Sequence, residues 1–270
     1  KYPNQIVEVG IAEQNLVGVA AGLASAGKKA FAVSPACFLS ARALEQIKND
    51  VAYSDNPVKL VGISAGVSYG ALGTTHHSLH DYAALRAINN ITIVAPADNF
   101  ETEQAVRKAV EFNKPIYLRL GKKPMPFLNE ADQRFEFGKG RVVREGQDFA
   151  IIANGETVYP AWLAAKSLEE EHGIKTTVVS MHTIKPLDTD LLENIAANGT
   201  PIMTVEEHMI NGGLGEACAS YLFQKGARNP FKIKAIPDEY TVTGSQGEIF
   251  EHYGISQKGI VASALELLKN

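Results

Sequence analysis

The sequence predicts an α/β protein with two consecutive open, doubly wound domains, each built around a mainly parallel sheet. Short and nearly continuous apolar runs alternate with helical segments, which is typical of parallel strands that helices cover on both faces. The 270 residues suffice for two domains of ordinary size. The alternation stops between Gly121 and Gly140 and then resumes, which predicts a linker between the two domains.

The first domain is predicted to cover residues 1–122. An Ala/Gly-rich helix begins near Glu13. An apolar residue then recurs at every fourth position over 39–51, which predicts a helix with one buried face. Asp98 followed by Glu101 predicts the start of another helix, with Asp98 as its N-cap. The expected strands are residues 30–33, 58–63, 91–95 and 116–120.

The second domain is predicted to cover residues 139–270. The linker before it, residues 123–138, contains Pro124, Pro126 and mixed charges, and shows no regular period. The expected strands are residues 149–153, 176–181, 202–205 and 233–236. The expected helices are residues 157–171, 187–197, 212–226, 247–253 and 257–269.

Charge and composition exclude several classes of protein. There are 26 Lys+Arg and 30 Asp+Glu residues, with no basic block, so no nucleic-acid partner is expected. No apolar run approaches the roughly 18–20 residues of a membrane span, and no signal peptide is recognisable, so no membrane partner is expected. Cys37 and Cys218 are too few for a disulfide scaffold or a zinc module. We therefore expect a cytoplasmic protein.

Ligands of open α/β sheets bind at the carboxyl ends of the strands, which directs attention to the loops after Val33, Ile63, Leu120 and Val205. The usual glycine-rich nucleotide signatures are missing. The glycines within 212–215 have two interpretations. They either present backbone amides to an anion at a helix N-terminus, or allow close helix–strand packing, and a lone cluster favours packing.

Three histidines, His76, His77 and His80, follow a glycine-rich loop at 66–73. No carboxylate or cysteine at zinc-site spacing completes a metal site, so no metal ligand is assigned. A loop histidine after a parallel strand is well placed to contact a polar substrate. For each histidine, substrate contact and simple packing both stay open.

Glu13 also has two interpretations. A carboxylate buried in an interface would have a raised pKa unless it met a cationic or proton-sharing partner. An acid in the first turn of a helix is also favourable for local reasons, because it interacts well with the helix dipole. Spacing alone favours the second interpretation.

Taken together, these segments resemble the transketolase family, and more narrowly the C-terminal half of a transketolase, the subunit of a split, two-gene enzyme. The resemblance covers essentially the whole chain. It depends on the segments Glu8–Asn15, Gly73–His76 continuing to Asp81 and Leu85–Arg86, Val94–Asp98, Pro115–Arg119, Lys185–Asp188, and Glu206–His208 leading to Gly212–Gly215.

The resemblance implies thiamine diphosphate, bound between two kinds of domain. Residues 1–122 match the pyrimidine-binding domain, and residues 139–270 match the transketolase C-terminal domain. The family's other domain binds the diphosphate and Mg²⁺ (or Ca²⁺) through a Gly-Asp-Gly motif, which this sequence lacks. The resemblance therefore implies an N-terminal partner subunit that holds the metal, a heterotetramer, and small sugar phosphates as substrates.

The resemblance also implies roles for single residues. Glu13 matches the catalytic glutamate that hydrogen-bonds the pyrimidine nitrogen N1′, and Phe38 aligns with the aromatic residue that stacks on the pyrimidine. His76 matches the catalytic histidine that contacts the reacting oxygens of the donor ketose. Lys122 falls where a phosphate-binding arginine is usual, and keeps the charge without the bidentate fork. The cofactor is the electron sink, while the protein supplies position and protons.

Two substrate-binding positions depart from the family pattern. Leu72 stands where ordinary transketolases have an Asp that hydrogen-bonds a substrate hydroxyl. Ser64 stands where a phosphate-contacting His is common. A site that lacks a partner for a hydroxyl should tolerate a sugar without that hydroxyl. We therefore expect a deoxy, branched or sulfonated sugar as an alternative to an ordinary pentulose phosphate.

The resemblance implies roughly one more strand–helix unit before the glutamate motif, about 30 residues. Only Lys1–Val7 precede that motif, so either this sequence starts late within the domain, or the domain lacks this unit and should expose a sheet edge. In the second domain, Glu206, Glu207 and His208 end a strand. They either line a ligand crevice or serve an interface, and the resemblance implies mainly dimer packing for this domain.

Three alternatives remain. A 1-deoxyxylulose-5-phosphate synthase-like protein has a similar Gly-Ile-Ala-Glu-Gln segment, but normally includes the diphosphate domain and has an Asp where Leu72 stands. A 2-oxoacid dehydrogenase β subunit is also a split C-terminal half, but Asp81 and Arg86 fit transketolases better. A scaffold or regulatory paralogue would keep the fold without turnover, and the presence of Glu13 and His76 argues against it.

Overall fold

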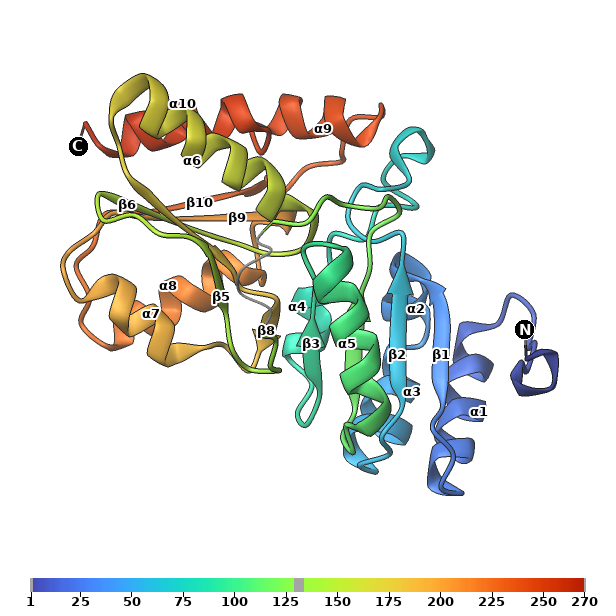
Figure 1. Ribbon diagram of the computed structural model, residues 1–270. Helices are drawn as coiled ribbons and strands as arrows, with labels where there is room; N and C mark the ends of the chain where they lie inside the picture. The colour runs from blue at the N-terminus through green and yellow to red at the C-terminus, as the bar shows by residue number, and fades with distance from the viewer. Residues whose placement is uncertain (1, 129–133, 270) are drawn as a thin grey trace.

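The computed structural model describes residues 2–128 and 134–269, which form two α/β domains with mainly parallel sheets (Figure 1). Each sheet has five strands. The first sheet has the order β1-β2-β4-β3-β8, and the second has the order β10-β9-β6-β7-β5. Residues 129–133 of the predicted linker lie outside the described residues.

The first sheet takes four parallel strands from the first half of the chain and one antiparallel strand from the second half. The strands are β1 (Phe31–Pro35), β2 (Lys59–Ile63), β3 (Thr92–Val94), β4 (Ile116–Arg119) and β8 (Thr183–Lys185). The sequence does not predict β8, because a three-residue strand has no readable period. Its pairing with β3 joins the two domains through one sheet.

Helices cover both faces of the first sheet. One face packs against α1, α2, η2 and α4, and the other packs against α5. The elements are η1 (Pro3–Gln5), α1 (Glu13–Ser25), α2 (Ala36–Arg42), α3 (Leu44–Gln46), η2 (Ile47–Tyr53), η3 (Gly70–Leu72), α4 (Asp81–Arg86) and α5 (Asn99–Glu111).

The single helix predicted over 39–51 is wrong in detail. The backbone of Ala43 leaves helical geometry at φ −101° and ψ 20°, so α2 ends at Arg42 and the chain continues through α3 into the π-helix η2. The apolar positions at every fourth residue nevertheless all point into the core, since Leu39, Ile47 and Val51 are fully buried. The pattern thus predicted the buried face correctly and missed the break.

The second sheet is parallel except for its edge strand β5, which pairs antiparallel with β7. The strands are β5 (Arg141–Arg144), β6 (Phe149–Ala153), β7 (Thr176–Ser180), β9 (Ile202–Met209) and β10 (Phe231–Ile236). Strand β5 was not predicted from the sequence. The predicted strand 202–205 was also too short, because β9 continues through three buried polar residues, Glu206, Glu207 and His208.

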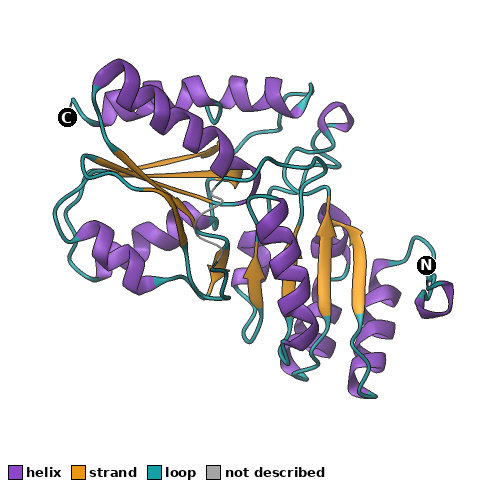
Figure 2. Cartoon of the chain, in the orientation of Figure 1, coloured by secondary structure: helices purple, strands orange, loops and turns teal. Residues whose placement is uncertain are grey.

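Two layers of helices sandwich the second sheet (Figure 2). Along the central strand β6, Phe149 and Ile151 face α6, α9 and α10, whereas Ala150 and Ile152 face α7 and α8. This alternation follows from the two-residue period of a strand. The helical elements are η4 (Gly155–Thr157), α6 (Val158–His172), α7 (Thr189–Ala196), α8 (Leu214–Gln224), α9 (Gln246–Tyr253) and α10 (Gln257–Leu267).

Local sequence signals set one end of α5 and one end of α6. The Asp98 carboxylate accepts the Glu101 backbone N–H at 2.7 Å, which confirms the predicted N-cap of α5. Gly173 ends α6 in the left-handed conformation at φ 69°. Within the described residues, no helix is long and apolar enough to cross a membrane.

Strand β1 forms one edge of the first sheet. Among the described residues it pairs with β2 alone, and its side chains Phe31 and Val33, which share one face of the sheet, are 37% and 50% exposed. The extended segment 5–10 lies beside this edge, and together they border a groove of about 350 Å³ that also reaches Glu13 and Ser34.

Candidate active site

Glu13 is the first residue of α1, and its side chain is buried, with 4% exposed. Ser34 at the end of β1 donates its hydroxyl to Oε1 at 3.2 Å, and Arg42 at the end of α2 forms an ion pair with Oε2. Burial alone raises the pKa of this carboxyl, but hydrogen bonds from its own backbone N–H and from Arg42 outweigh burial and lower it. Glu13 is therefore a buried carboxylate that stays ionised because it has a cationic partner.

Phe38 and His76 lie next to this ion pair. The Arg42 guanidinium lies over the Phe38 ring, 5.0 Å from its centroid. The Phe38 ring meets the His76 ring edge to face at 5.3 Å, although the two residues come from α2 and from the glycine-rich loop. The Thr75 hydroxyl is 3.0 Å from His76 Nδ1 and orients that ring.

The same line of contacts continues to Lys122. The Tyr69 ring packs edge to face against His76 at 5.6 Å, and Lys122 Nζ lies 5.3 Å from the Tyr69 centroid. Four of the predicted site residues, Glu13, Phe38, His76 and Lys122, are thus joined by unbroken contacts at the carboxyl ends of the first sheet.

The other two predicted positions flank this line. Leu72 ends the short helix η3, where its backbone N–H donates to the Tyr69 carbonyl at 3.1 Å and its side chain is 55% exposed. Ser64 directly follows β2, is buried, and adopts a left-handed backbone at φ 51°. A left-handed backbone is uncommon for a residue other than glycine, and it turns the chain sharply into the glycine-rich loop.

Sequence reasoning missed Arg42 and Tyr69, the two residues that complete the line. Arg42 follows Phe38 by four positions on α2, a spacing that places both side chains on one helix face. That signal was readable from the sequence. Tyr69 carries no comparable signal, because it lies in a loop whose path the sequence does not define.

The three histidines separate in the structure. His77 is buried and contacts Thr241, while His80 Nε2 lies 3.3 Å from the Ser40 hydroxyl. Only His76 takes part in the line of contacts described above. Among residues 2–128 and 134–269, no group of three or more His, Cys, Asp or Glu side chains could hold a metal ion.

Asp81, Tyr117 and Arg119 form a buried hydrogen-bond network that connects the two domains. The Asp81 carboxylate accepts from the Tyr117 hydroxyl and from Arg119 Nε, each at 2.8 Å. Arg119 Nη2 also donates to the carbonyl oxygens of Ser78 at 3.0 Å and Glu207 at 2.8 Å. Burial alone would raise the pKa of Asp81, but Arg119 outweighs it, so the pKa is lowered. Arg119 thereby ties the end of the first sheet to β9 of the second.

The glycine cluster of 212–215 combines both interpretations. The Glu206 carboxyl group accepts the backbone N–H groups of Leu214 at 2.7 Å and Gly215 at 2.8 Å, so the start of α8 binds a carboxyl group of the chain itself, and burial raises the pKa of that group to about 7. A Cβ on Gly213 would lie closer than 3.0 Å to this carboxyl group, so the glycine also allows α8 to pack closely against β9. Arg86 completes the junction by donating to the carbonyls of Gly212 and Gly213.

Comparison with known proteins identifies the family. The chain is 48% identical over 271 residues to an apulose-4-phosphate transketolase subunit of Phocaeicola vulgatus, an alignment that covers 100% of this chain and 86% of that protein. The chain belongs to the transketolase family. The family profiles "Transketolase, pyrimidine binding domain" and "Transketolase, C-terminal domain" match residues 1–126 and 138–260.

Other transketolase relatives have the same extent. The "Putative transketolase C-terminal section" of Methanocaldococcus jannaschii is 36% identical over 100% of this chain and 84% of its own length. A solved structure, "Split gene transketolase, inactive beta4 tetramer", superposes with a TM-score of 0.88 at 37% identity, covering 99% of this chain and 86% of that one. These relatives show that the chain corresponds to the C-terminal half of a transketolase.

The transketolase family implies thiamine diphosphate, and the described residues fit its pyrimidine end. An ionised, buried carboxylate such as Glu13 can accept a hydrogen bond from a protonated ring nitrogen, and the contact of its Oε1 with the Ser34 hydroxyl is long, at 3.2 Å. The half-buried ring of Phe38 offers an aromatic surface beside it. Glu13 and Phe38 would therefore hold the pyrimidine, and His76 would face the substrate end.

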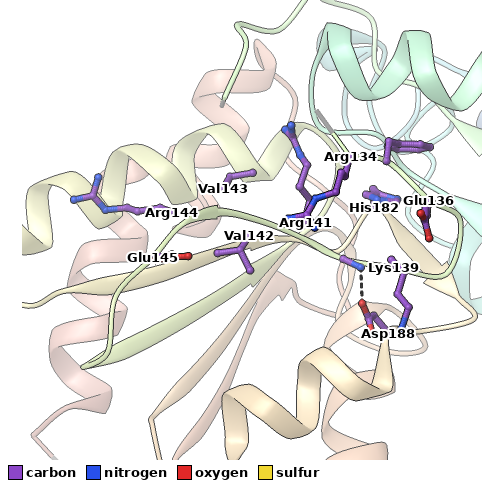
Figure 3. A pocket seen from close by; sticks show the side chains of 12 residues that line it. Arg134, Glu136, Lys139, Arg141, Val142, Val143, Arg144, Glu145, His182 and Asp188 are labelled. Carbon is purple, nitrogen blue, oxygen red and sulfur yellow. Dashed lines mark hydrogen bonds and ion pairs between the residues drawn. The ribbon is translucent and has the colours of Figure 1, made fainter. Parts of the chain in front are cut away.

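A larger cavity of about 620 Å³ lies elsewhere, beside β5 (Figure 3). Several of its charged side chains are engaged within the chain: Lys139 pairs with Asp188 at 3.3 Å, and Arg141 pairs with Glu101 at 3.0 Å. None of the predicted site residues of this transketolase chain lines it. The line from Glu13 to Lys122 is therefore the candidate site.

Proposed function

We propose that this chain is the C-terminal subunit of a thiamine-diphosphate-dependent transketolase, active with an N-terminal partner subunit. The enzyme transfers a two-carbon ketol unit from a ketose phosphate donor to an aldose acceptor. The observation that carries the proposal is the unbroken line of contacts from Glu13 through Phe38 and His76 to Lys122. It presents a carboxylate, an aromatic surface, an imidazole and a cation in the order that such a transfer needs.

Each side chain then has a defined task. When bound, the cofactor supplies the electron sink for the broken C–C bond. Glu13 holds a proton at the pyrimidine ring nitrogen, and its ion pair with Arg42 keeps the carboxylate charged for that purpose. Thr75 holds His76 at Nδ1, so that Nε2 can bind the donor oxygens and move a proton there. Lys122 attracts the substrate phosphate as a point charge.

The partner supplies what this sequence lacks. The chain has no Gly-Asp-Gly motif, so we assign the diphosphate and the Mg²⁺ or Ca²⁺ to the N-terminal subunit. The similar split-gene transketolase is described as inactive when it forms a beta4 tetramer, which supports the need for a second kind of subunit, and we propose a heterotetramer as the active form. We place the enzyme in the cytoplasm, without a nucleic-acid or membrane partner.

For the donor we propose a branched ketose phosphate, with apulose 4-phosphate as the first compound to test. Two relatives, 48% and 41% identical, are named for this sugar, and a third, 34% identical, is named for 6-deoxy-6-sulfo-D-fructose. The exposed apolar side chain of Leu72 offers no hydrogen bond to a substrate hydroxyl, which suits a non-standard sugar. A branch at C3 makes that carbon a tertiary alcohol, so the fragment released from it is a ketone.

Co-expression with the transketolase N-terminal section from the neighbouring gene tests this proposal. The purified complex, with thiamine diphosphate and Mg²⁺, is given ribose 5-phosphate as acceptor, because glyceraldehyde 3-phosphate would only re-form xylulose 5-phosphate from that donor. Apulose 4-phosphate, xylulose 5-phosphate and 6-deoxy-6-sulfofructose serve as donors in turn. We expect turnover only in the complex, with the highest kcat/KM for apulose 4-phosphate.

Several results would contradict parts of the proposal. Turnover by this chain alone would contradict the split enzyme, and preference for xylulose 5-phosphate would contradict the branched donor. Release of CO₂ from pyruvate would indicate a 1-deoxyxylulose-5-phosphate synthase, to which the chain is 37% identical over 98% of its length. A complex that neither binds thiamine diphosphate nor cleaves any ketose would indicate a scaffold.

A further inference from the structure

A segment of the second domain, Thr241–Gln246, packs against residues 66–77. These residues comprise the glycine-rich loop at 66–73 and its continuation to His77, and they carry Tyr69 and His76. We refer to all of 66–77 as the loop. The approach is close enough to exclude side chains. A Cβ on Gly70 would lie 2.5 Å from the Gly244 carbonyl oxygen, and one on Gly73 would lie 3.0 Å from the Thr243 methyl group. The second domain therefore touches the loop itself and not only its flanks.

Thr241 fixes the residue next to His76. The Thr241 hydroxyl lies 2.6 Å from His77 Nδ1, and His77 Nε2 lies 3.0 Å from the Gly70 carbonyl oxygen. Because a carbonyl only accepts, Nε2 carries the proton and Nδ1 accepts from Thr241. Burial lowers the pKa of His77, which keeps the ring in this neutral form.

Gln246 makes the second connection. Its side-chain Nε2 donates to Glu156 Oε2 at 2.6 Å and to Glu207 Oε1 at 2.9 Å. The same two carboxyl groups hold the loop, since Glu207 Oε1 accepts the Val67 backbone N–H at 2.9 Å and Glu156 Oε2 accepts the Ser68 hydroxyl at 3.3 Å. One amide thus donates to two buried carboxyl groups, and both of these also accept a hydrogen bond from the start of the loop.

The position of this bridge in the fold is informative. Glu156 follows β6 and Glu207 lies on β9, two neighbouring parallel strands between which the strand order of the second sheet reverses. Open α/β sheets take their ligands at such a point. Here the backbone of the first domain enters it, because a Cβ on Gly66 or Gly121 would collide with the Glu207 or Glu156 carboxyl. The second domain therefore binds the catalytic loops in the place of a ligand.

We propose that Gln246 is a positioning residue of the active site, which fixes the glycine-rich loop by bridging Glu156 and Glu207 and so sets His76 against the donor sugar. This inference rests on the proposed ketol transfer for its effect on turnover. Without the amide, the two buried carboxyl groups that contact the loop lose their shared hydrogen-bond donor, and a buried polar group that loses its partner is destabilised. The loop then moves, and His76 loses its alignment with Phe38.

The test compares Gln246→Leu with Gln257→Leu in the complex of this chain and its N-terminal partner. Gln257 is a matched control, because it also begins a helix and also donates through its side-chain amide, but to Ser167 within the second domain. We expect Gln246→Leu to speed amide hydrogen exchange of residues 66–77 about tenfold and to lower kcat by about tenfold. Gln257→Leu should leave exchange over 66–77 and kcat unchanged.

A swap variant separates positioning from a general loss of stability. Gln246→Glu alone places three carboxyl groups together and should loosen the loop. Adding Glu156→Gln restores one amide at the bridge, and we expect it to recover most of the protection over 66–77. Unchanged exchange in Gln246→Leu, an equal effect of Gln257→Leu, or no recovery in the swap would each overturn the inference. Exchange decides the inference even if no donor is turned over, and turnover by the unmodified complex decides the proposed function.

Discussion

The ring of His76 meets the ring of Phe38 edge to face, with 5.3 Å between their centroids. Phe38 comes from a helix that follows β1, whereas His76 comes from a loop that follows β2, and parallel pairing of the two strands brings them together. The Arg42 guanidinium lies over the face of the Phe38 ring and forms an ion pair with Glu13. One aromatic ring therefore connects the acid that would serve the cofactor with the imidazole that would serve the substrate.

Glu13→Gln should abolish most of the ketol transfer of the complex. The amide keeps the size of the side chain and can accept from Ser34, but it has no charge with which to hold a proton at the ring nitrogen. Loss of a group that moves a proton typically costs about 10²–10⁴-fold in kcat. Steady-state rates measure this loss, and Glu111→Gln, in an exposed ion pair with Lys29, is the control. Activity within twofold of the unmodified complex would contradict the role of Glu13.

Arg42→Leu should move the acid limb of the pH–rate profile to higher pH. Arg42 favours the charged form of Glu13 and helps to lower its pKa, so removal of the guanidinium makes the carboxyl take up a proton at higher pH. The profile of kcat/KM for the donor measures the change. Arg107→Leu removes an exposed cation paired with Glu103 and should leave the profile in place. An acid limb that stays in place in Arg42→Leu would show that the ion pair does not set the charge of Glu13.

Glu207→Gln should make the chain's stability less dependent on pH. Burial and then the charge of Glu156 raise the pKa of Glu207 to about 8, whereas an unfolded Glu titrates near 4.3. Between these values the folded state binds the extra proton, so its stability falls as the pH rises toward 8 and then levels off. Gln does not titrate, so the stability of the variant should not fall in this way as the pH rises.

The midpoint of thermal unfolding, followed from pH 5 to pH 9, measures the difference. Relative to the unmodified chain, Glu207→Gln should gain about 5 °C across the window, the shift that about 2 kcal/mol gives in a chain of this length. The exposed Glu111→Gln should run parallel to the unmodified chain. A constant difference between Glu207→Gln and the unmodified chain would mean that Glu207 does not hold its proton in the folded state.

Two glycines should respond to alanine in opposite directions. Gly213 packs against the Glu206 carboxylate, so the extra methyl group overfills the junction and should cost about 1–3 kcal/mol. Gly22 lies in the exposed part of α1 with open space around its Cβ position, so alanine should add about 0.5–1 kcal/mol. Urea unfolding of both variants measures the change. If Gly213→Ala loses no stability, Gly213 does not pack as closely as the structure shows, and if Gly22→Ala loses stability, the space beside Gly22 is not open.

The sequence could predict the parts of the fold that carry their own period or cap. The apolar runs predicted the eight parallel strands, and Asp98 predicted the start of α5. It could not predict β5 and β8, which are short, contain charged residues, and exist only because distant strands pair with them. Arg141 on β5, for example, is buried where two carboxylates from the start of α5 pair with it, Glu101 at 3.0 Å and Asp98 at 3.4 Å.

The candidate site shows the same division. Glu13, Phe38, His76 and Lys122 could be named as candidates because several segments of the chain together resemble the transketolase family. Tyr69 and Gln246 could not, since each acts through a contact between segments far apart in the chain. Several motif residues also proved to have structural partners. Glu206 caps α8, and Arg119 joins Asp81 to β9, so a specific motif does not by itself separate a catalytic residue from a framework residue.

Leu72→Asp should shift the preferred donor toward an ordinary pentulose phosphate. Leu72 lies on η3 beside Tyr69 and is 55% exposed, so a carboxylate there costs little stability and can reach a substrate hydroxyl. A hydrogen bond to a charged group contributes about 1.5–3 kcal/mol, which corresponds to a gain of roughly tenfold or more in kcat/KM for xylulose 5-phosphate relative to apulose 4-phosphate. Paired donor assays on the complex measure the ratio, with Leu72→Asn as a neutral control that should give a smaller shift. If neither variant changes the ratio, Leu72 does not face the donor, and the choice of sugar must be made elsewhere in the site.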